Sequence, residues 1–332
     1  MREHFGSIRP CCGRMGGRLG LLTGVALGAL LGAGQPAQAA LMITPTFASS
    51  ITSDPNAAAI EGVINTAINT YQTDFTDPIN INITFQEMAS GLGSSSTAFF
   101  NVSYAAYHAA LVADAKTAND ATALARLAVD GAGVNNPITS NSTINVKSAI
   151  LRAVGLPGAV ASDGTIGLNT HITDVGSPGT TGQFSLIATT EHEIDEVLGL
   201  GSSLPSVPFN DPFPEDLFRF SSTGVRSFTT NSAAQAFFSI DGTTDLAQFD
   251  NQNDGGDFGD WQSNPLPPGV GPKVQDAFAT PGAAPSLGTE LTALDVIGYD
   301  FNAPVATPEP GTLALLGTGL LALTMVRRRR RT

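Results

Sequence analysis

The stretch EHEIDEVLGLG, residues 191–201, decides how the rest of this sequence is interpreted. An α-helix advances about 100° per residue, so His192 and Glu196 lie about 40° apart on one face, while apolar residues gather on the opposite arc. A histidine and a carboxylate one turn apart can both reach one metal ion, and Glu193, just round the helix, can reach a water bound to that ion. The stretch therefore predicts a metal-binding helix with one polar face and one packed face.

The first 39 residues have the parts of a secretory signal peptide. Four arginines precede or enter an apolar run, Leu19–Ala33, and Ala37-Gln38-Ala39 fits a cleavage site. A first transmembrane helix is the alternative, but the run is short and Gly-rich. Cys11 and Cys12 both lie in this segment, so the rest of the chain has no cysteine and can form no disulfide. We expect an exported domain without disulfides.

The remaining chain is strongly acidic. Between Leu41 and Ala306 it has 7 basic and 27 acidic residues, a net charge of −20. Such a surface repels nucleic acid and anionic membranes and is compatible with bound cations. With 42% hydrophobic and 14% charged residues, the chain can bury a sizeable core. We therefore expect a folded domain over 41–302 that does not bind nucleic acid.

The C-terminal end combines three features in a fixed order. Pro308-Glu309-Pro310 is followed by an apolar stretch, Gly311–Val326, and then by Arg327–Arg331. An apolar segment followed by arginines stops transfer and holds the chain in the inner membrane. Residues 308–332 resemble the PEP-CTERM sorting signal of Gram-negative bacteria, with 303–307 as a linker. The resemblance implies the secretion machinery and an exosortase-type sorting enzyme as partners, and delivery to the cell envelope or outside the cell. A permanent membrane anchor is the alternative.

Hydrophobic periodicity predicts the elements around the central stretch. Spacing of three and four predicts an amphipathic helix over 55–71, and strict alternation predicts a strand over 79–85. Residues 91–96 are Gly- and Ser-rich and are predicted to form a loop. A further strand over 164–171 and a closing helix over 290–297 complete an α+β order.

This order resembles the metzincin-like zincin fold, a single catalytic domain in which a small twisted sheet backs a central metal-binding helix. More particularly, the chain from about Leu41 to Asn302 resembles a family of PEP-CTERM-tailed bacterial zinc metalloproteases with a His-Glu-x-x-Glu helix. The resemblance rests on the segments His192–Gly199, Glu215–Arg219, Gly256–Trp261, Val274–Phe278 and Leu291–Tyr299.

The resemblance implies a zinc site in which His192 and Glu196 are metal ligands and Glu193 is the general base. Glu196 replaces the second histidine of the usual H-E-x-x-H helix, and its negative charge makes the ion a weaker Lewis acid. Ser202 stands where metzincins have a third histidine, and no methionine lies between Met88 and Met325 to form a Met-turn.

A third ligand must come from elsewhere in the chain. Asp216 is the favoured residue because Leu217 and Phe218 can anchor its segment, and a surface ion pair between Asp216 and Arg219 is the alternative. The other residues of suitable type are His171, Asp211, Glu215 and Asp295.

Another acidic cluster, Asp250, Asp254, Asp257 and Asp260, lies in a Gly-rich segment. Oxygen ligands at this spacing suit Ca²⁺, with a plain polar turn as the alternative. His108 lies among aromatic residues at helical spacing and is expected to be packed or half-exposed.

These observations predict an exported zinc-dependent endopeptidase that hydrolyses peptide bonds of a polypeptide substrate by a metal-activated water. Two alternatives stay open. One is a non-catalytic exported envelope or matrix protein on a zincin-like scaffold, and the other is a hydrolase that uses a carboxylate-rich site with a different metal.

Overall fold

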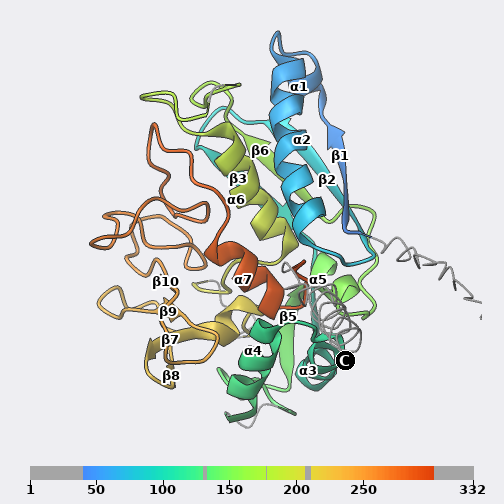
Figure 1. Ribbon diagram of the computed structural model, residues 1–332, viewed down its shortest axis with the longest axis vertical. Coiled ribbons are helices and arrows are strands. Elements are labelled where there is room, and N and C mark those ends of the chain that lie inside the picture. The colour runs from blue at the N-terminus through green and yellow to red at the C-terminus, as the bar shows by residue number, and fades with distance from the viewer. Residues whose placement is uncertain (1–39, 130–132, 177, 206–210, 303–332) are drawn as a thin grey trace, which may run out of the picture. The chain divides into compact units, whose positions relative to one another are not determined.

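The computed structural model describes residues 40–129, 133–176, 178–205 and 211–302 (Figure 1). The predicted signal peptide 1–39, the linker 303–307 and the tail 308–332 lie outside the described residues. The prediction of an α+β chain is confirmed, since helices and small sheets are mixed along the sequence.

A four-stranded sheet in the order β1-β2-β6-β3 lies next to the candidate site. Its strands are β1 (Met42–Phe47), β2 (Asn80–Glu87), β6 (Gly164–Leu168) and β3 (Gly93–Thr97). β1, β2 and β6 are parallel, whereas β3 runs antiparallel to β6 at the edge. Alternate residues of β2 are buried, which confirms the strand predicted over 79–85.

The prediction of a loop over 91–96 is wrong, because residues 93–97 form β3. The sequence of this strand, Gly-Ser-Ser-Ser-Thr, has only one β-branched residue and little apolar surface. It is a strand because each of its residues pairs with one on β6, from Gly93 opposite Leu168 to Thr97 opposite Gly164. Strand formation depends strongly on such neighbours, which local sequence does not reveal.

Two long helices lie side by side in front of this sheet (Figure 1). α2 (Ala57–Asp74) follows the short helix α1 (Ser49–Thr52) and connects the parallel strands β1 and β2. α6 (Leu186–Leu198) follows β6 and contains the central stretch. Both predicted helices are therefore confirmed, α2 ending slightly later than the pattern indicated.

The remaining elements surround the C-terminal end of α6. Helices α3 and α4 are separated at residues 115–117. A second small sheet has the order β10-β9-β7-β8, and β4 pairs with β5. The bounds are β4 (Phe99–Ser103), α3 (Tyr104–Asp114), α4 (Ala118–Val129), β5 (Thr143–Lys147), α5 (Ser148–Ala153), the 3-10 helix η1 (Glu215–Phe218), β7 (Arg219–Ser222), β8 (Val225–Arg226), β9 (Phe237–Phe238), β10 (Ala247–Gln248) and α7 (Thr289–Val296).

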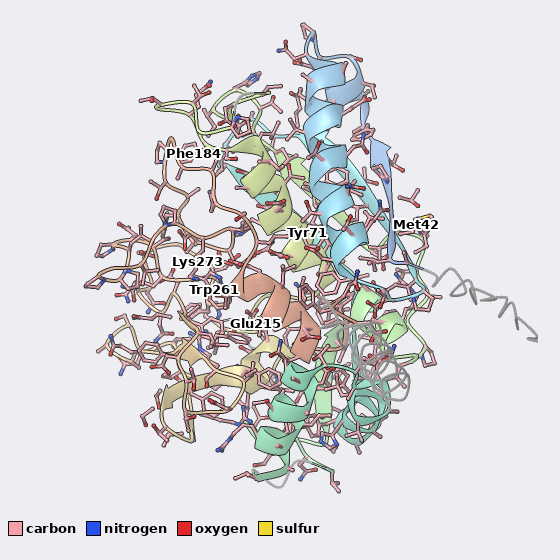
Figure 2. The ribbon with its side chains drawn as sticks, viewed as in Figure 1. Met42, Tyr71, Phe184, Glu215, Trp261 and Lys273 are labelled. Carbon is pink, nitrogen blue, oxygen red and sulfur yellow. The ribbon has the colours of Figure 1, made fainter. Side chains whose placement is uncertain are left out.

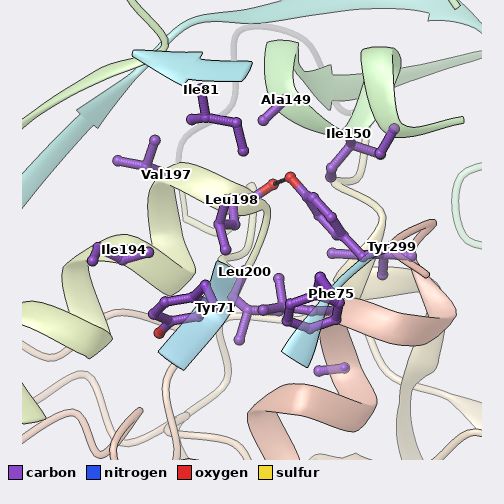
Figure 3. Close-up of a cluster of buried hydrophobic side chains, with 14 of the residues drawn as sticks. Tyr71, Phe75, Ile81, Ala149, Ile150, Ile194, Val197, Leu198, Leu200 and Tyr299 are labelled. Carbon is purple, nitrogen blue, oxygen red and sulfur yellow. Dashed lines mark hydrogen bonds between the residues drawn. The ribbon is translucent and has the colours of Figure 1, made fainter. Parts of the chain in front are cut away.

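The apolar face of α6 is fixed in the core, as the periodicity predicted. Figure 3 shows Ile194, Val197 and Leu198 of this helix facing side chains from β2, α5 and the C-terminal segment. The buried hydroxyl of Tyr299 donates a 2.7 Å hydrogen bond to the carbonyl of Leu198. Because the apolar face of α6 is packed in the core, its polar face has a defined orientation.

Candidate metal centre

Side-chain hydrogen bonds cap both ends of α6. At its start, the Ser185 hydroxyl accepts a hydrogen bond from the Ala188 amide, as an N-cap residue does. At its end, the buried ammonium of Lys147 donates to the carbonyls of Glu196 and Leu200, each at 2.5 Å. A cation at this position satisfies carbonyls that the helix leaves free and complements its dipole.

The polar face of α6 brings together the predicted donors. His192, Glu193 and Glu196 each offer a ligand atom within 4.8 Å of the other two, and a second such group joins Glu196, Asp257 and Asp260. Glu196 belongs to both groups, and His192 Nε2 lies 3.9 Å from Glu196 Oε1 and 3.8 Å from Asp260 Oδ2. One imidazole and several carboxylates thus converge on one place, which is a ligand set that Zn²⁺ accepts.

Asp260 reaches the end of α6 because Gly259 allows close backbone contact. A Cβ atom added to Gly259 would lie 2.4 Å from the Cα of Gly201, so a side chain at position 259 would push the two segments apart. The next residue, the buried Trp261, donates from Nε1 to Glu290 Oε1 at 2.9 Å. Arg219, fully buried, donates to the Phe258 carbonyl. These contacts hold the segment 258–261 against the end of the helix.

The side chains of His192, Glu196 and Asp260 are each oriented by a hydrogen bond to a residue outside the donor groups. His192 Nδ1 lies 3.0 Å from the Val274 carbonyl, which selects the tautomer with a free Nε2. The Ser95 hydroxyl donates to Glu196 Oε2 at 2.6 Å, and Gln275 Nε2 donates to Asp260 Oδ1 at 2.9 Å. The oxygens left over on Glu196 and Asp260, Oε1 and Oδ2, are the ones that lie 3.9 and 3.8 Å from His192 Nε2.

Glu193 differs from these three in having a buried oxygen without a partner. Within the described residues, its Oε2 is fully buried and makes no hydrogen bond. Burial raises the pKa of Glu193, and burial likewise raises the pKa of Asp260. Burial disfavours a charged His192, but Asp260, Glu193 and Glu196 outweigh it and raise the pKa of His192 to about 10. Such a concentration of buried charge is typical of a functional site.

The centre opens into a cavity of about 510 Å³. The edge strand β3 and the residues before it line the cavity, and so do residues 272–274 and 276–280. Phe184 and Lys273, both labelled in Figure 2, are among the lining residues. The cavity therefore borders the acidic donors and is lined around them by polar and apolar residues.

The structure places Asp216, the favoured third ligand, outside both donor groups. Its carboxylate accepts hydrogen bonds from the Ser202 hydroxyl at 2.5 Å and from the Phe213 and Ser203 amides at 2.9 and 3.1 Å. Asp216 and Arg219 are both buried, so the alternative of an exposed surface pair is wrong. The contacts of Asp216 are those of a residue that fixes the loop after α6.

The other residues considered for the third ligand also lie outside the donor groups. Asp211 accepts from Asn101, Asn141 and Thr143, and Asp295 accepts from Thr117 and Asn119. Glu215 accepts from the Gly201 amide, and His171 is exposed after β6. His108 is half-buried against the ring of Tyr104, as expected.

The acidic cluster predicted to bind Ca²⁺ is divided. Asp257 and Asp260 are grouped with Glu196. Asp250 and Asp254 instead accept hydrogen bonds from the amides of Gln252 and Gly256 within their own turn. The sequence analysis grouped Asp260 with Asp250 and Asp254, whereas the structure brings Asp257 and Asp260 to Glu196. The signal available was the family resemblance, which had singled out the segment Gly256–Trp261.

The comparisons with known proteins concern the C-terminal tail. The family model of the PEP-CTERM protein-sorting motif matches residues 306–331. This motif indicates an exported protein and implies recognition by an exosortase-type sorting machinery. No curated protein and no solved structure matches the chain. In the part of the chain that the structure describes, no helix is both long enough and apolar enough to cross a membrane.

Proposed function

We propose that the chain is an exported, zincin-like zinc endopeptidase whose centre consists of His192, Glu196 and Asp260 as ligands and Glu193 as general base. The observation that carries this proposal is the convergence of three oriented donors beside a buried, unpartnered oxygen of Glu193 in the described structure. A buried polar atom without a partner costs about 1–3 kcal/mol. A cation held by His192, Glu196 and Asp260 would bring a partner to this atom.

The donor chemistry fits zinc. One imidazole nitrogen and two carboxylate oxygens are three of the four positions of a catalytic zinc site, which leaves one for water or substrate. Each donor is fixed by a separate hydrogen bond, as ligands of metal sites are. When bound, the ion supplies Lewis acidity that polarises a peptide carbonyl and lowers the pKa of water.

Glu193 supplies the proton transfers of peptide hydrolysis. Glu193 lies beside the donors on the polar face of α6, at the position of the general base in an H-E-x-x-H helix. The carboxylate takes a proton from the attacking water and later donates it to the amine of the leaving peptide. The edge strand β3 lines the same cavity, and an extended substrate can pair with its free edge. Together these features favour an endopeptidase over an enzyme for small substrates.

Metal analysis and one substitution test the proposal. The purified exported protein should hold zinc at near-stoichiometric occupancy and hydrolyse casein. Glu193→Gln should retain zinc but lose at least about 100-fold in kcat, which is the range of general-base catalysis. A wild-type protein without zinc, or full casein hydrolysis by Glu193→Gln, would overturn the proposal and favour a non-catalytic envelope protein.

Asp260→Asn and Asp216→Asn distinguish the two candidate third ligands. Both substitutions keep the shape of the side chain and remove its charge. Asp260→Asn should lower zinc affinity by more than the 10- to 100-fold that is typical of outer-shell changes. Asp216→Asn should lower zinc affinity by no more than about that factor. The opposite result would return Asp216 to the site.

The carboxylate-rich donor set also favours a second candidate, a hydrolase with a harder metal. Glu196, Asp257 and Asp260 offer only oxygen atoms, which suit Mn²⁺ or Ca²⁺. Activity of the metal-free protein restored by Mn²⁺ or Ca²⁺ but not by Zn²⁺ would select this candidate.

A further inference from the structure

The edge strand β3 touches the proposed base and one proposed ligand through alternate residues. Gly93 and Ser95 lie two positions apart and therefore face the same side, which is the side of α6. Ser94 points the other way, with its hydroxyl 3.6 Å from the sulfur of Met88. The predicted loop is thus a strand that presents one face to the centre.

Gly93 leaves the space that the Glu193 carboxylate occupies. A Cβ atom added to Gly93 would lie 2.2 Å from Glu193 Oε1 and 2.9 Å from its Cδ, both closer than real Cβ contacts allow. The backbone does not require glycine here, because Gly93 is not among the glycines with positive φ. The remaining close contact, Thr189 Cγ2 at 3.0 Å, is tight but allowed. The reason for a glycine at this position is therefore the carboxylate.

Ser95 sets which oxygen of Glu196 faces His192. Its hydroxyl donates to Oε2 at 2.6 Å, and Oε1 is the oxygen that lies 3.9 Å from His192 Nε2. The contact from Lys147 reaches only the carbonyl of Glu196 and does not orient its carboxylate. A freely rotating ligand pays rotamer entropy when it binds a metal ion.

We propose that β3 is the positioning element of the metal centre: Gly93 fixes the place of the base by leaving room for it, and Ser95 fixes the orientation of the ligand Glu196. The inference rests on the proposed function, since it assigns roles to the strand that faces the zinc site. Neither residue touches the reacting atoms, and each acts through a glutamate of α6. The two roles are separable, because Gly93 serves proton transfer and Ser95 serves metal affinity.

Gly93→Ala tests the first role. The clashing atoms are the end of a flexible side chain, so the variant can fold with Glu193 displaced. We expect kcat to fall about 100-fold, as displacements of about 1 Å do, with KM and zinc affinity unchanged. In a Glu193→Asp background, where the carboxylate is one methylene shorter, the same substitution should cost less than about threefold. Gly62→Ala is the matched control, since no atom lies within 4 Å of its added Cβ.

Ser95→Ala tests the second role without an activity assay. Competition with a chromophoric chelator should show zinc affinity reduced by about 10- to 100-fold, and Ser95→Thr, which keeps the hydroxyl, should restore most of it. Ser96→Ala, on the opposite face of the strand, is the control and should match the wild type. Equal zinc affinity in Ser95→Ala and wild type would overturn this role.

The outcomes separate the two proposals. Suppose that the wild type binds zinc and cleaves casein. If Gly93→Ala then leaves kcat unchanged, or lowers kcat equally in the wild-type and Glu193→Asp backgrounds, only the positioning role of Gly93 is overturned. A wild type that binds no zinc overturns the positioning roles and the proposed function together.

Discussion

The stability of the domain should depend on pH through Asp77, a fully buried carboxyl next to the C-terminal segment. One of its oxygens accepts a 2.9 Å hydrogen bond from the Asp300 amide, and the other has no partner among the described residues. Burial is the main cause that raises the pKa of Asp77, to about 7 from an ordinary value of 3.8. Between these two values the folded protein holds a proton that the unfolded chain has released, so stability falls as pH rises.

The substitution Asp77→Asn removes this titration and keeps an oxygen for the Asp300 amide. From pH 5 to pH 8 the wild type should lose about 2.5 kcal/mol that the variant retains, because about two units of the pKa shift fall in this range, at about 1.36 kcal/mol per unit. The difference in unfolding free energy between Asp77→Asn and wild type should therefore increase by this amount.

Urea unfolding at several pH values measures this difference, with a chelator present so that metal binding does not contribute. Gly62→Ala is the control, because it removes no titrating group and no atom lies within 4 Å of its added Cβ. The difference in unfolding free energy between Gly62→Ala and wild type should not change with pH. A flat difference for Asp77→Asn would refute the reasoning, since it would mean that burial does not hold a proton on Asp77.

Three further predictions concern the packing and the metal dependence of α6. Gly199→Ala should destabilise the fold by about 1–3 kcal/mol, measured by urea unfolding, because the added Cβ would lie 2.7 Å from Cδ1 of both Ile150 and Ile297; an unchanged midpoint would contradict this. Tyr299→Phe should cost about 1–2 kcal/mol in the same assay, since it removes the buried 2.7 Å hydrogen bond to Leu198, and a neutral effect would show that this carbonyl finds another donor. Removal of zinc by a chelator should lower Tm by roughly 5–10 °C relative to protein at 100 times the zinc Kd, which corresponds to about 2.7 kcal/mol. Calorimetry checks this, and a Tm independent of zinc would contradict a site in the folded state.

The sequence pattern was sufficient to predict the elements that depend mainly on residues close together in the sequence. The periodicity of residues 191–201 predicted a helix, its buried face and the shared polar face of His192 and Glu196, because these follow from 3.6 residues per turn. The alternation in β2 and the amphipathic pattern of α2 were equally clear. The sorting motif was recognisable for the same reason, since its three parts are consecutive.

Tertiary structure alone decided the edge strand and the position of the proposed third ligand. Gly93–Thr97 has a composition typical of a loop and is a strand only because it pairs with β6. Asp260 and Asp216 are both carboxylates downstream of the helix, and no local pattern ranks one above the other. Asp260 lies beside His192 because Gly259 lets two segments far apart in the sequence touch, and because buried partners hold the residues near it. Periodicity describes neighbours along a helix or strand, whereas a metal site depends on contacts between segments far apart in the sequence.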